Sequence, residues 1–140
     1  MKVDNWKEKG NTHLDLELSD TMPYHEVVAD LVCKYAKDDD RLIDLGCGLG
    51  HVLTEVKTRR ENLTFDIADA YQACLDATSK RVDVGKTFQL NELTFDVRTA
   101  IDSRYNVAVM SHVLEHLIFP AKALDDVFSL LEPGGIMIVA

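Results

Sequence analysis

Apolar and polar positions along this chain follow two different periods. Between residues 23 and 35 the apolar residues recur at helical spacing, and Pro23 suits the first turn of such a helix. The run Arg41-Leu42-Ile43-Asp44-Leu45 is short, largely apolar and followed by glycines, which is typical of a buried strand. Helix-like and strand-like segments keep alternating up to residue 140. The pattern therefore predicts an α/β fold with a parallel sheet.

The later elements follow from the same reasoning. Helices are expected over 51–60, 68–80 and 121–131, and strands over 63–66, 93–96, 105–110 and 136–140. The segment 81–92 stays open, because 86–90 fits either an early start of the third strand or a separate edge strand. Pro133, Gly134 and Gly135 predict a turn.

Residues 1–20 are polar and weakly patterned, and they predict an N-terminal arm that is either mobile or docked over a ligand. Residues 21–140 are expected to form one domain, as suits a chain of 140 residues with a hydrophobic share of 46%. No apolar stretch is long enough to span a membrane, and residues 1–10 lack the apolar core of a signal peptide. A cytoplasmic protein is expected.

The charge argues against a nucleic-acid partner. The chain has 24 acidic and 15 basic residues and a net charge of −9, whereas nucleic-acid binders usually carry a basic surface. Cys33, Cys47 and Cys74 are widely spaced and form no CxxC pair, so neither a disulfide framework nor a metal site is indicated. A small-molecule partner fits these observations better.

Candidate ligand residues follow the predicted strands, because open parallel sheets bind ligands at the carboxyl ends of their strands. Asp44, Asp66 and Asp96 each lie at the end of a predicted strand, and Ser111 with His112 follows another. Asp66 follows Gly46 by twenty residues, and a carboxylate at the end of the second strand can accept hydrogen bonds from both hydroxyl groups of a ribose.

The first of these strands leads into the turn Gly46-Cys47-Gly48-Leu49-Gly50, where glycines allow a tight turn and close approach of a ligand. A nicotinamide-type turn reads GxGxxG and would need glycine or alanine where this chain has His51, so a nicotinamide-dependent oxidoreductase is disfavoured. Asp44 either belongs to the ligand site or caps the next helix. Cys47 is interpreted as a small residue packed in the turn.

These segments together resemble the class I S-adenosylmethionine-dependent methyltransferases, from about Val27 to Ala140. Residues 41–50 resemble the family's first motif, and Phe65-Asp66-Ile67 resembles its acidic motif on the second strand. Residues 105–110 followed by Ser111-His112-Val113-Leu114-Glu115-His116-Leu117 are similar to its fourth strand and "vLEHl" signature. Residues 130–135 resemble the "LkPGG" that precedes its fifth strand.

The resemblance implies a Rossmann-like, doubly wound and mostly parallel sheet with strand order 3-2-1-4-5. It also implies S-adenosyl-L-methionine as cofactor and a methyl transfer to a small or medium-sized acceptor. The implied cofactor-binding residues are Asp44, Leu45, Gly46, Cys47, Gly48, Gly50, Asp66, Ile67, Asp96, Val97, Ser111 and His112. In this arrangement Asp66 holds the ribose, Asp96 meets the adenine amine, and the backbone at Ser111 and His112 lines the methionine end.

Several histidines admit more than one interpretation. His116 is expected either at the acceptor pocket, as a candidate catalytic residue, or packed against its helix. His112-Val113-Leu114-Glu115-His116 also matches the HxxEH pattern of zinc peptidases, but that motif requires a long helix and Pro120 closes this one early. Tyr24 and His25 either cover the cofactor or lie on the surface. Asp69 is interpreted as the N-cap of the helix that follows.

Family members normally continue past the fifth strand, and strands 6 and 7 are expected to be absent here. The fifth strand would then be an exposed edge, which a second copy of the chain or another partner chain could cover. An alternative function follows from this, namely a non-catalytic or partner-dependent S-adenosylmethionine-binding module.

Overall fold

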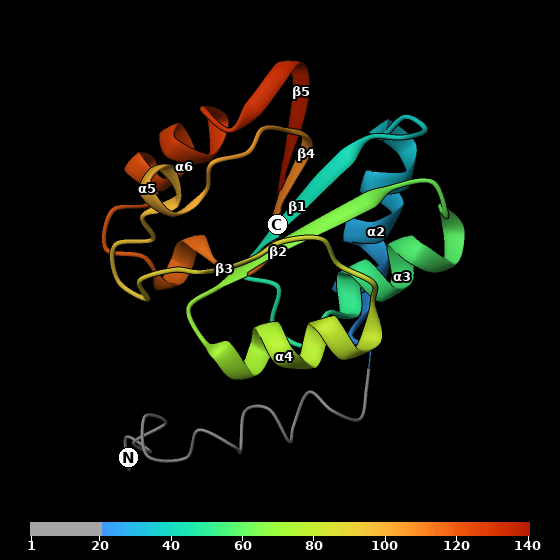
Figure 1. The fold of residues 1–140 in the computed structure, drawn as a ribbon, viewed down its shortest axis with the longest axis horizontal. Helices are drawn as coiled ribbons and strands as arrows, with labels where there is room; N and C mark the ends of the chain where they lie inside the picture. Colours follow the sequence, from blue (N-terminus) through green and yellow to red (C-terminus); the bar gives the residue numbers. More distant parts are fainter. Residues whose placement is uncertain (1–20) are drawn as a thin grey trace.

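The computed structural model describes residues 21–140, so the arm expected over residues 1–20 lies outside the described part. Five parallel strands form one sheet in the order β3-β2-β1-β4-β5, which confirms the expected topology (Figure 1). The strands are β1 (Arg41–Leu45), β2 (Thr64–Asp69), β3 (Thr87–Gln89), β4 (Tyr105–Met110) and β5 (Leu131–Val139).

Helices cover both faces of this sheet (Figure 1). One face packs against α2 (Pro23–Tyr35), α3 (His51–Arg59) and α4 (Gln72–Arg81), and the other against α5 (Val97–Ala100) and α6 (Pro120–Phe128). A short 3-10 helix, η1 (Leu114–His116), lies between β4 and α6. Because the central strands are buried on both sides, most of their residues are apolar. Within residues 21–140, no helix combines the length and the apolar character that crossing a membrane requires.

The expected third strand over 93–96 is wrong, and the strand lies earlier, at Thr87–Gln89. Residues 91–96 instead form a turn in which Asn91 Oδ1 accepts hydrogen bonds from the N–H groups of Leu93 and Thr94. Phe95 has a positive φ of 51° and is buried. Its apolar side chain therefore reflects packing against α5 and α6, not a strand.

The second strand is longer than expected. It runs to Asp69, because Ile67 and Ala68 are fully buried and pair with β3 as well as with β1. Helix α4 consequently begins at Gln72, and its N-cap is Tyr71. Asp69 is therefore the last residue of a strand, and its interpretation as an N-cap is wrong.

The fifth strand contains the expected Pro133-Gly134-Gly135 turn as an irregularity within it. Tyr105 pairs with Leu131 and Val107 with Ile136, so two steps along β4 correspond to five along β5. Gly134 has φ +78°, which accommodates the local change of direction. Strand β5 thus starts at Leu131, and α6 ends at Phe128, three residues earlier than expected.

Candidate functional site

The glycine-rich turn is held tightly from two sides. Gly46, Gly48 and Gly50 all have positive φ values, of 80°, 53° and 79°. A Cβ atom on Gly46 would lie 2.4 Å from Val113 Cγ2, and one on Gly50 would lie 2.9 Å from Thr78 Cγ2. The chain therefore needs glycine at these positions both for backbone conformation and for close packing.

Asp69 lies beside this turn. Its Oδ2 accepts a hydrogen bond from the N–H of Gly48 at 3.0 Å, and its Oδ1 accepts one from the N–H of Tyr71, also at 3.0 Å. As the last residue of β2, it stands at the carboxyl edge of the sheet, next to the end of β1. A carboxylate in this position can accept ribose hydroxyl groups.

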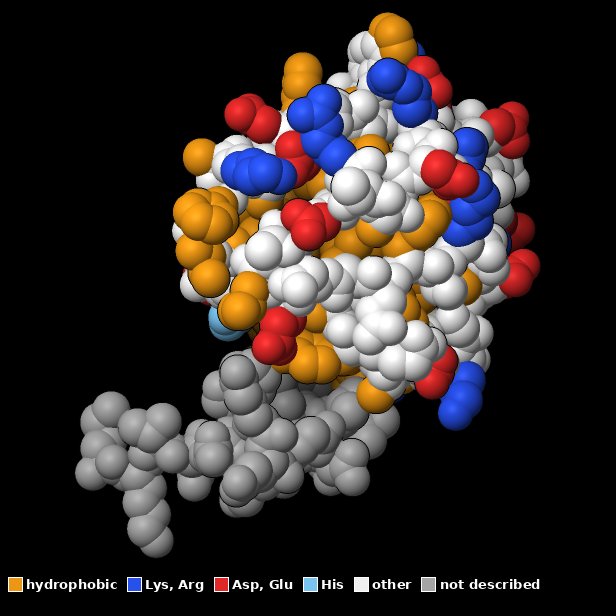
Figure 2. Space-filling model, turned by 60° about the vertical axis from the view of Figure 1, so that its left-hand side comes forward, with side chains coloured by type: hydrophobic (Ala, Val, Ile, Leu, Met, Phe, Trp, Pro, Cys, Tyr) orange, Lys and Arg blue, Asp and Glu red, His pale blue; other side chains and the backbone are white. Residues whose placement is uncertain are grey.

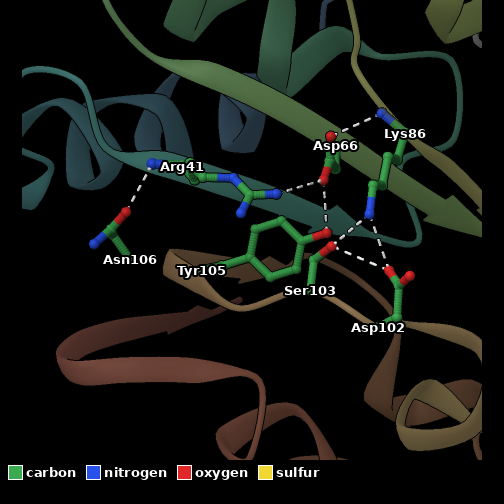
Figure 3. Close-up of polar contacts among 7 residues, drawn as sticks. All are labelled: Arg41, Asp66, Lys86, Asp102, Ser103, Tyr105 and Asn106. Atoms are coloured by element: carbon green, nitrogen blue, oxygen red, sulfur yellow. Dashed lines mark hydrogen bonds and ion pairs between the residues drawn. The ribbon is translucent and has the colours of Figure 1, made fainter.

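Asp66, which the sequence suggested for that position, lies three residues before the end of β2. Figure 3 shows its carboxylate among Arg41, Lys86 and Tyr105. The Tyr105 hydroxyl donates to Oδ2 at 2.7 Å, the Lys86 N–H donates to Oδ1 at 2.8 Å, and Arg41 Nη2 lies 3.4 Å from Oδ2. Arg41 and Tyr105 are the first residues of β1 and β4, so this network holds the opposite, amino edge of the sheet.

The position expected for Asp66 is therefore occupied by Asp69, and the expectation that Asp66 ends its strand is wrong. The tetrapeptide Leu-Thr-Phe-Asp occurs twice, at 63–66 and 93–96, and neither copy ends a strand in its aspartate. Two further apolar residues, Ile67 and Ala68, were the available signal that β2 continues to Asp69. Ile67 itself is fully buried in the core.

Asp44 is buried under the turn, with 2% of its surface exposed. Burial raises the pKa of this carboxyl to about 7, and the nearby charge of Asp69 adds to the effect. The N-cap of α3 is Gly50, so Asp44 does not cap that helix. Two carboxyl groups therefore lie near each other here. Asp44 tends to be protonated near neutral pH, and Asp69 at the end of β2 accepts a hydrogen bond from the turn.

Cys47 fits its interpretation as a packed residue. Its side chain is buried, and its Sγ accepts a hydrogen bond from Thr78 Oγ1 at 3.5 Å. Burial raises the pKa of the thiol, followed by smaller effects of Asp44 and Asp69, so the reactive thiolate is disfavoured. Leu45, just before the turn, is also fully buried.

The segment after β4 forms another side of the site. Met110 pairs with Leu45 in the sheet, which places Ser111 and His112 next to the glycine-rich turn. Within the described part of the chain, Ser111 Oγ is buried and has no hydrogen-bond partner. Buried polar atoms are nearly always paired, so this hydroxyl is suited to a ligand group.

The residues expected near an adenine ring lie farther along the same edge. Asp96 is exposed and is the N-cap of α5, with its Oδ2 accepting from Thr94 Oγ1 at 2.9 Å, while Val97 is buried. Closer to the end of β3, the Tyr71 hydroxyl donates to Glu92 Oε2 at 2.9 Å. This bond connects the loops that follow β2 and β3, and sequence reasoning did not single out either residue.

The first turn of α2 approaches the site with aromatic rings. His25 stacks on His51 with ring centroids 4.9 Å apart, and Tyr24 lies 4.2 Å from the ring of His112. His25 is buried, so the interpretation that it lies on the surface is wrong. Burial lowers the pKa of His25 to about 4, and the charges of His51 and His112 act in the same direction.

His116 lies on η1, where 73% of its side chain is exposed and its Nε2 lies 4.0 Å from Glu115 Oε1. The HxxEH pattern therefore spans a loop and a three-residue 3-10 helix, which does not provide the long helix that zinc peptidases use. Among residues 21–140, no three side chains of His, Cys, Asp or Glu are grouped so as to hold a metal ion.

Comparisons with known proteins agree with this geometry. Residues 21–140 match the family described as "Methyltransferase domain". A ubiquinone biosynthesis O-methyltransferase from Parvibaculum lavamentivorans is 25% identical over 134 residues, covering 96% of this chain and 47% of that protein. A protein of the same name from Cereibacter sphaeroides is 32% identical over 106 residues, covering 70% and 39%. The chain thus spans less than half the length of these relatives.

Solved structures show the same fold. An O-methyltransferase family protein from Burkholderia thailandensis is 26% identical with a TM-score of 0.65, covering 84% of this chain and 36% of that one. An S-adenosylmethionine-bound amino pentose methyltransferase from Micromonospora echinaspora has a TM-score of 0.64 at 22% identity, covering 83% and 48%. Sequence motifs, strand order and family match converge, and this chain belongs to the methyltransferase-domain family with the class I, Rossmann-like fold of S-adenosylmethionine-dependent methyltransferases.

Proposed function

We propose that this chain binds S-adenosyl-L-methionine and forms the cofactor-binding part of a methyltransferase that acts on a hydroxyl group of a small or medium-sized acceptor. The contact between Asp69 and the Gly48 N–H carries the proposal. It fixes a carboxylate at the end of β2, directly beside a glycine-rich turn at the end of β1. This is the arrangement that nucleoside-containing cofactors require at the carboxyl edge of a parallel sheet.

The residues along this edge fit the parts of the cofactor. Asp69 would accept the ribose hydroxyl groups, in the role that the sequence suggested for Asp66. The turn from Gly46 to Gly50 would pass under the methionine part, and Ser111 Oγ would meet one of its polar groups. Asp96 and Val97 are proposed at the adenine end.

Such a cofactor supplies a methyl group that is already activated by the positive charge on its sulfur. The chain's own task is then to hold the acceptor in line with that methyl group and to keep water away. A hydroxyl acceptor must also lose a proton during the reaction, so a base near the acceptor helps the transfer.

Two observations support a small hydroxyl-bearing acceptor. The curated relatives are named as O-methyltransferases of ubiquinone biosynthesis. The net charge is −9, and acidic and basic side chains are interspersed with apolar ones on the face shown in Figure 2, which does not suit a nucleic-acid polyanion. Ile118 and Phe119, just after η1, are more than half exposed and offer apolar contact to an acceptor.

The test is calorimetric titration of the chain with S-adenosylhomocysteine, comparing two aspartates of the same strand. Asp69→Asn should weaken binding at least tenfold, which corresponds to about 1.4 kcal/mol. Asp66→Asn is the matched control and should bind within about threefold of wild type, or about 0.65 kcal/mol, as long as it is folded. The reverse order of effects, or a folded wild type that does not bind, would contradict the proposed site.

Methyl transfer is tested separately with radiolabelled S-adenosylmethionine and a soluble catechol such as 4-methylcatechol. Labelled methyl ether formed by the wild type supports the proposed activity. Tight cofactor binding with no transfer to any hydroxyl acceptor would favour the binding-module alternative.

A further inference from the structure

His112 has an unusual backbone conformation at the edge of the site. It is a non-glycine residue with φ +54°, two residues after Met110, the last residue of β4. Its N–H donates to the carbonyl oxygen of Ala140 at 2.8 Å, and its ring packs against Tyr24. Left-handed conformations of such residues persist where surrounding contacts fix them, and they are concentrated at functional sites.

The neighbours of His112 connect it to the glycine-rich turn. Val113 packs against Gly46, and the buried Ser111 Oγ lies on the other side of His112 in the chain. About half of the His112 side chain is exposed. The ring therefore stands beside the methionine end of the proposed cofactor position and remains accessible to a second molecule.

Glu115 lies close to one of the two nitrogens of this ring. Its Oε1 lies 3.3 Å from His112 Nδ1, one turn away along the chain, whereas His116 Nε2 is 4.0 Å from the same oxygen. A carboxylate next to Nδ1 favours the tautomer that carries its proton there, which leaves Nε2 with a lone pair. Catalytic hydrogen bonds are often long before substrates bind, so 3.3 Å is compatible with such a role.

We propose that His112 is the general base for the acceptor hydroxyl, and that Glu115 is the positioning residue that orients it. This inference rests on the proposed function as an O-methyltransferase. The acceptor O–H bond breaks and its proton moves to His112 Nε2. The oxygen bonds the methyl carbon while the bond from carbon to sulfur breaks, and that electron pair stays on sulfur. Glu115 stabilises the imidazolium, which then loses its proton to solvent.

Titratable side chains from two elements surround His112. Among residues 21–140, the titratable side chains facing it are Tyr24 and His25 from α2 and Glu115 from η1, with His116 beyond Glu115. His25 is the group whose positive charge would oppose protonation of His112. Because the pKa of His25 is lowered to about 4, its ring is neutral near neutral pH and leaves the negative charge of Glu115 to act.

The tautomer provides a test that does not depend on turnover. Nitrogen NMR of the full chain with labelled histidine, recorded in EDTA, should show neutral His112 mainly protonated at Nδ1, with its signals assigned through His112→Asn. Glu115→Gln should shift this population toward protonation at Nε2, and Glu132→Gln, a change of an exposed residue on β5, should not. Neutral wild-type His112 mainly protonated at Nε2 would overturn the inference, whether or not methyl transfer is observed.

Kinetics test the same inference with 4-methylcatechol as acceptor. His112→Asn should lower kcat about 100-fold, the scale of general base catalysis, while S-adenosylhomocysteine binds within about threefold of wild type. The decline of kcat/KM toward acidic pH should disappear in this variant. A large loss of kcat in His116→Asn with little loss in His112→Asn would assign the base to His116 and overturn the inference. Failure of the wild type to methylate any hydroxyl acceptor counts against the proposed function, and the tautomer still decides the pairing of His112 with Glu115.

Discussion

The hydroxyl of Tyr105 donates to Asp66 Oδ2 at 2.7 Å and connects β4 to β2 across β1, which lies between them in the sheet. Arg41, the first residue of β1, forms an ion pair with the same carboxylate. Its guanidinium group lies over the Tyr105 ring, with Cζ 5.2 Å from the ring centroid. Three strands are therefore joined by side chains at the edge opposite the candidate site (Figure 3).

Removing the Tyr105 hydroxyl should lower the stability of the fold without weakening cofactor binding. Tyr105→Phe takes a donor from a nearly buried carboxylate, and such losses cost about 1–3 kcal/mol. Urea denaturation measures the free energy of unfolding. Tyr35→Phe, which changes an exposed tyrosine on α2, is the control and should stay within about 0.5 kcal/mol of wild type. Equal stability of both variants would contradict a structural role for the network.

Asp44 should make the folded protein less stable as pH rises from about 4 to about 7. The pKa of its carboxyl is raised from 3.8 to about 7, so the folded state holds a proton that the unfolded state has lost in this range. Its contribution to stability is full below pH 3.8 and is lost as pH rises through the folded pKa. Asp44→Asn should remove this component of the urea-denaturation profile, and an unchanged profile in that variant would contradict the shift.

His25 should act in the opposite direction. Its pKa is lowered from 6.5 to about 4, so the unfolded state binds more protons between these values and stability falls as pH falls from 6.5. The variant His25→Asn keeps an acceptor for the Met22 N–H, which donates to His25 Nδ1 at 3.0 Å in the wild type. This variant should lose the fall in stability toward acidic pH. Of the two effects, only the loss of stability with rising pH that Asp44 causes should then remain.

Two glycines with nearly equal φ values separate backbone strain from packing. Gly46 and Gly134 have φ of 80° and 78°, but a Cβ on Gly46 meets Val113 whereas one on Gly134 has nothing within 4 Å. A non-glycine residue at such a positive φ costs about 1–3 kcal/mol of stability, in Gly46→Ala and in Gly134→Ala alike. Gly46→Ala should lose additional stability and also cofactor binding.

The double variant Gly46→Ala/Val113→Ala tests the packing component directly. The double variant should recover part of the additional stability that Gly46→Ala loses. Val113→Ala removes the Cγ2 atom that the new Cβ at position 46 would meet. Urea denaturation of the two single variants and the double variant gives the interaction energy between the sites. Strictly additive effects would show that the contact with Val113 does not contribute.

Local patterns in the sequence predicted the alternation of strands and helices and the glycine-rich turn. Residues 105–110 are apolar except for Asn106, and the first strand ends where the glycines begin. The order of strands came from the resemblance to a family, since periodicity alone does not state which strands are neighbours. The structure and the family match confirm that order.

The expectation that Asp66 ends its strand is wrong for a physical reason. A strand inside a sheet can contain a buried aspartate when distant residues provide its hydrogen bonds, and here Lys86 and Tyr105 do so from 20 and 39 positions away. The local signal was limited to Ile67 and Ala68, two apolar residues that continue the strand to Asp69. The stacking of His25 on His51 was equally hidden, because it depends on how α2 packs against α3.

The proximity of Asp44 and Asp69 links ligand binding to proton binding. The negative charge of Asp69 contributes to the raised pKa of Asp44. Hydroxyl groups that donate to Asp69 in the proposed complex would withdraw part of that charge and reduce the cost of ionising Asp44. By thermodynamic reciprocity, occupation of the ribose position then releases protons near neutral pH, and alkaline conditions tighten cofactor binding by the same free energy. The protein would be a stronger acid with its cofactor than without it.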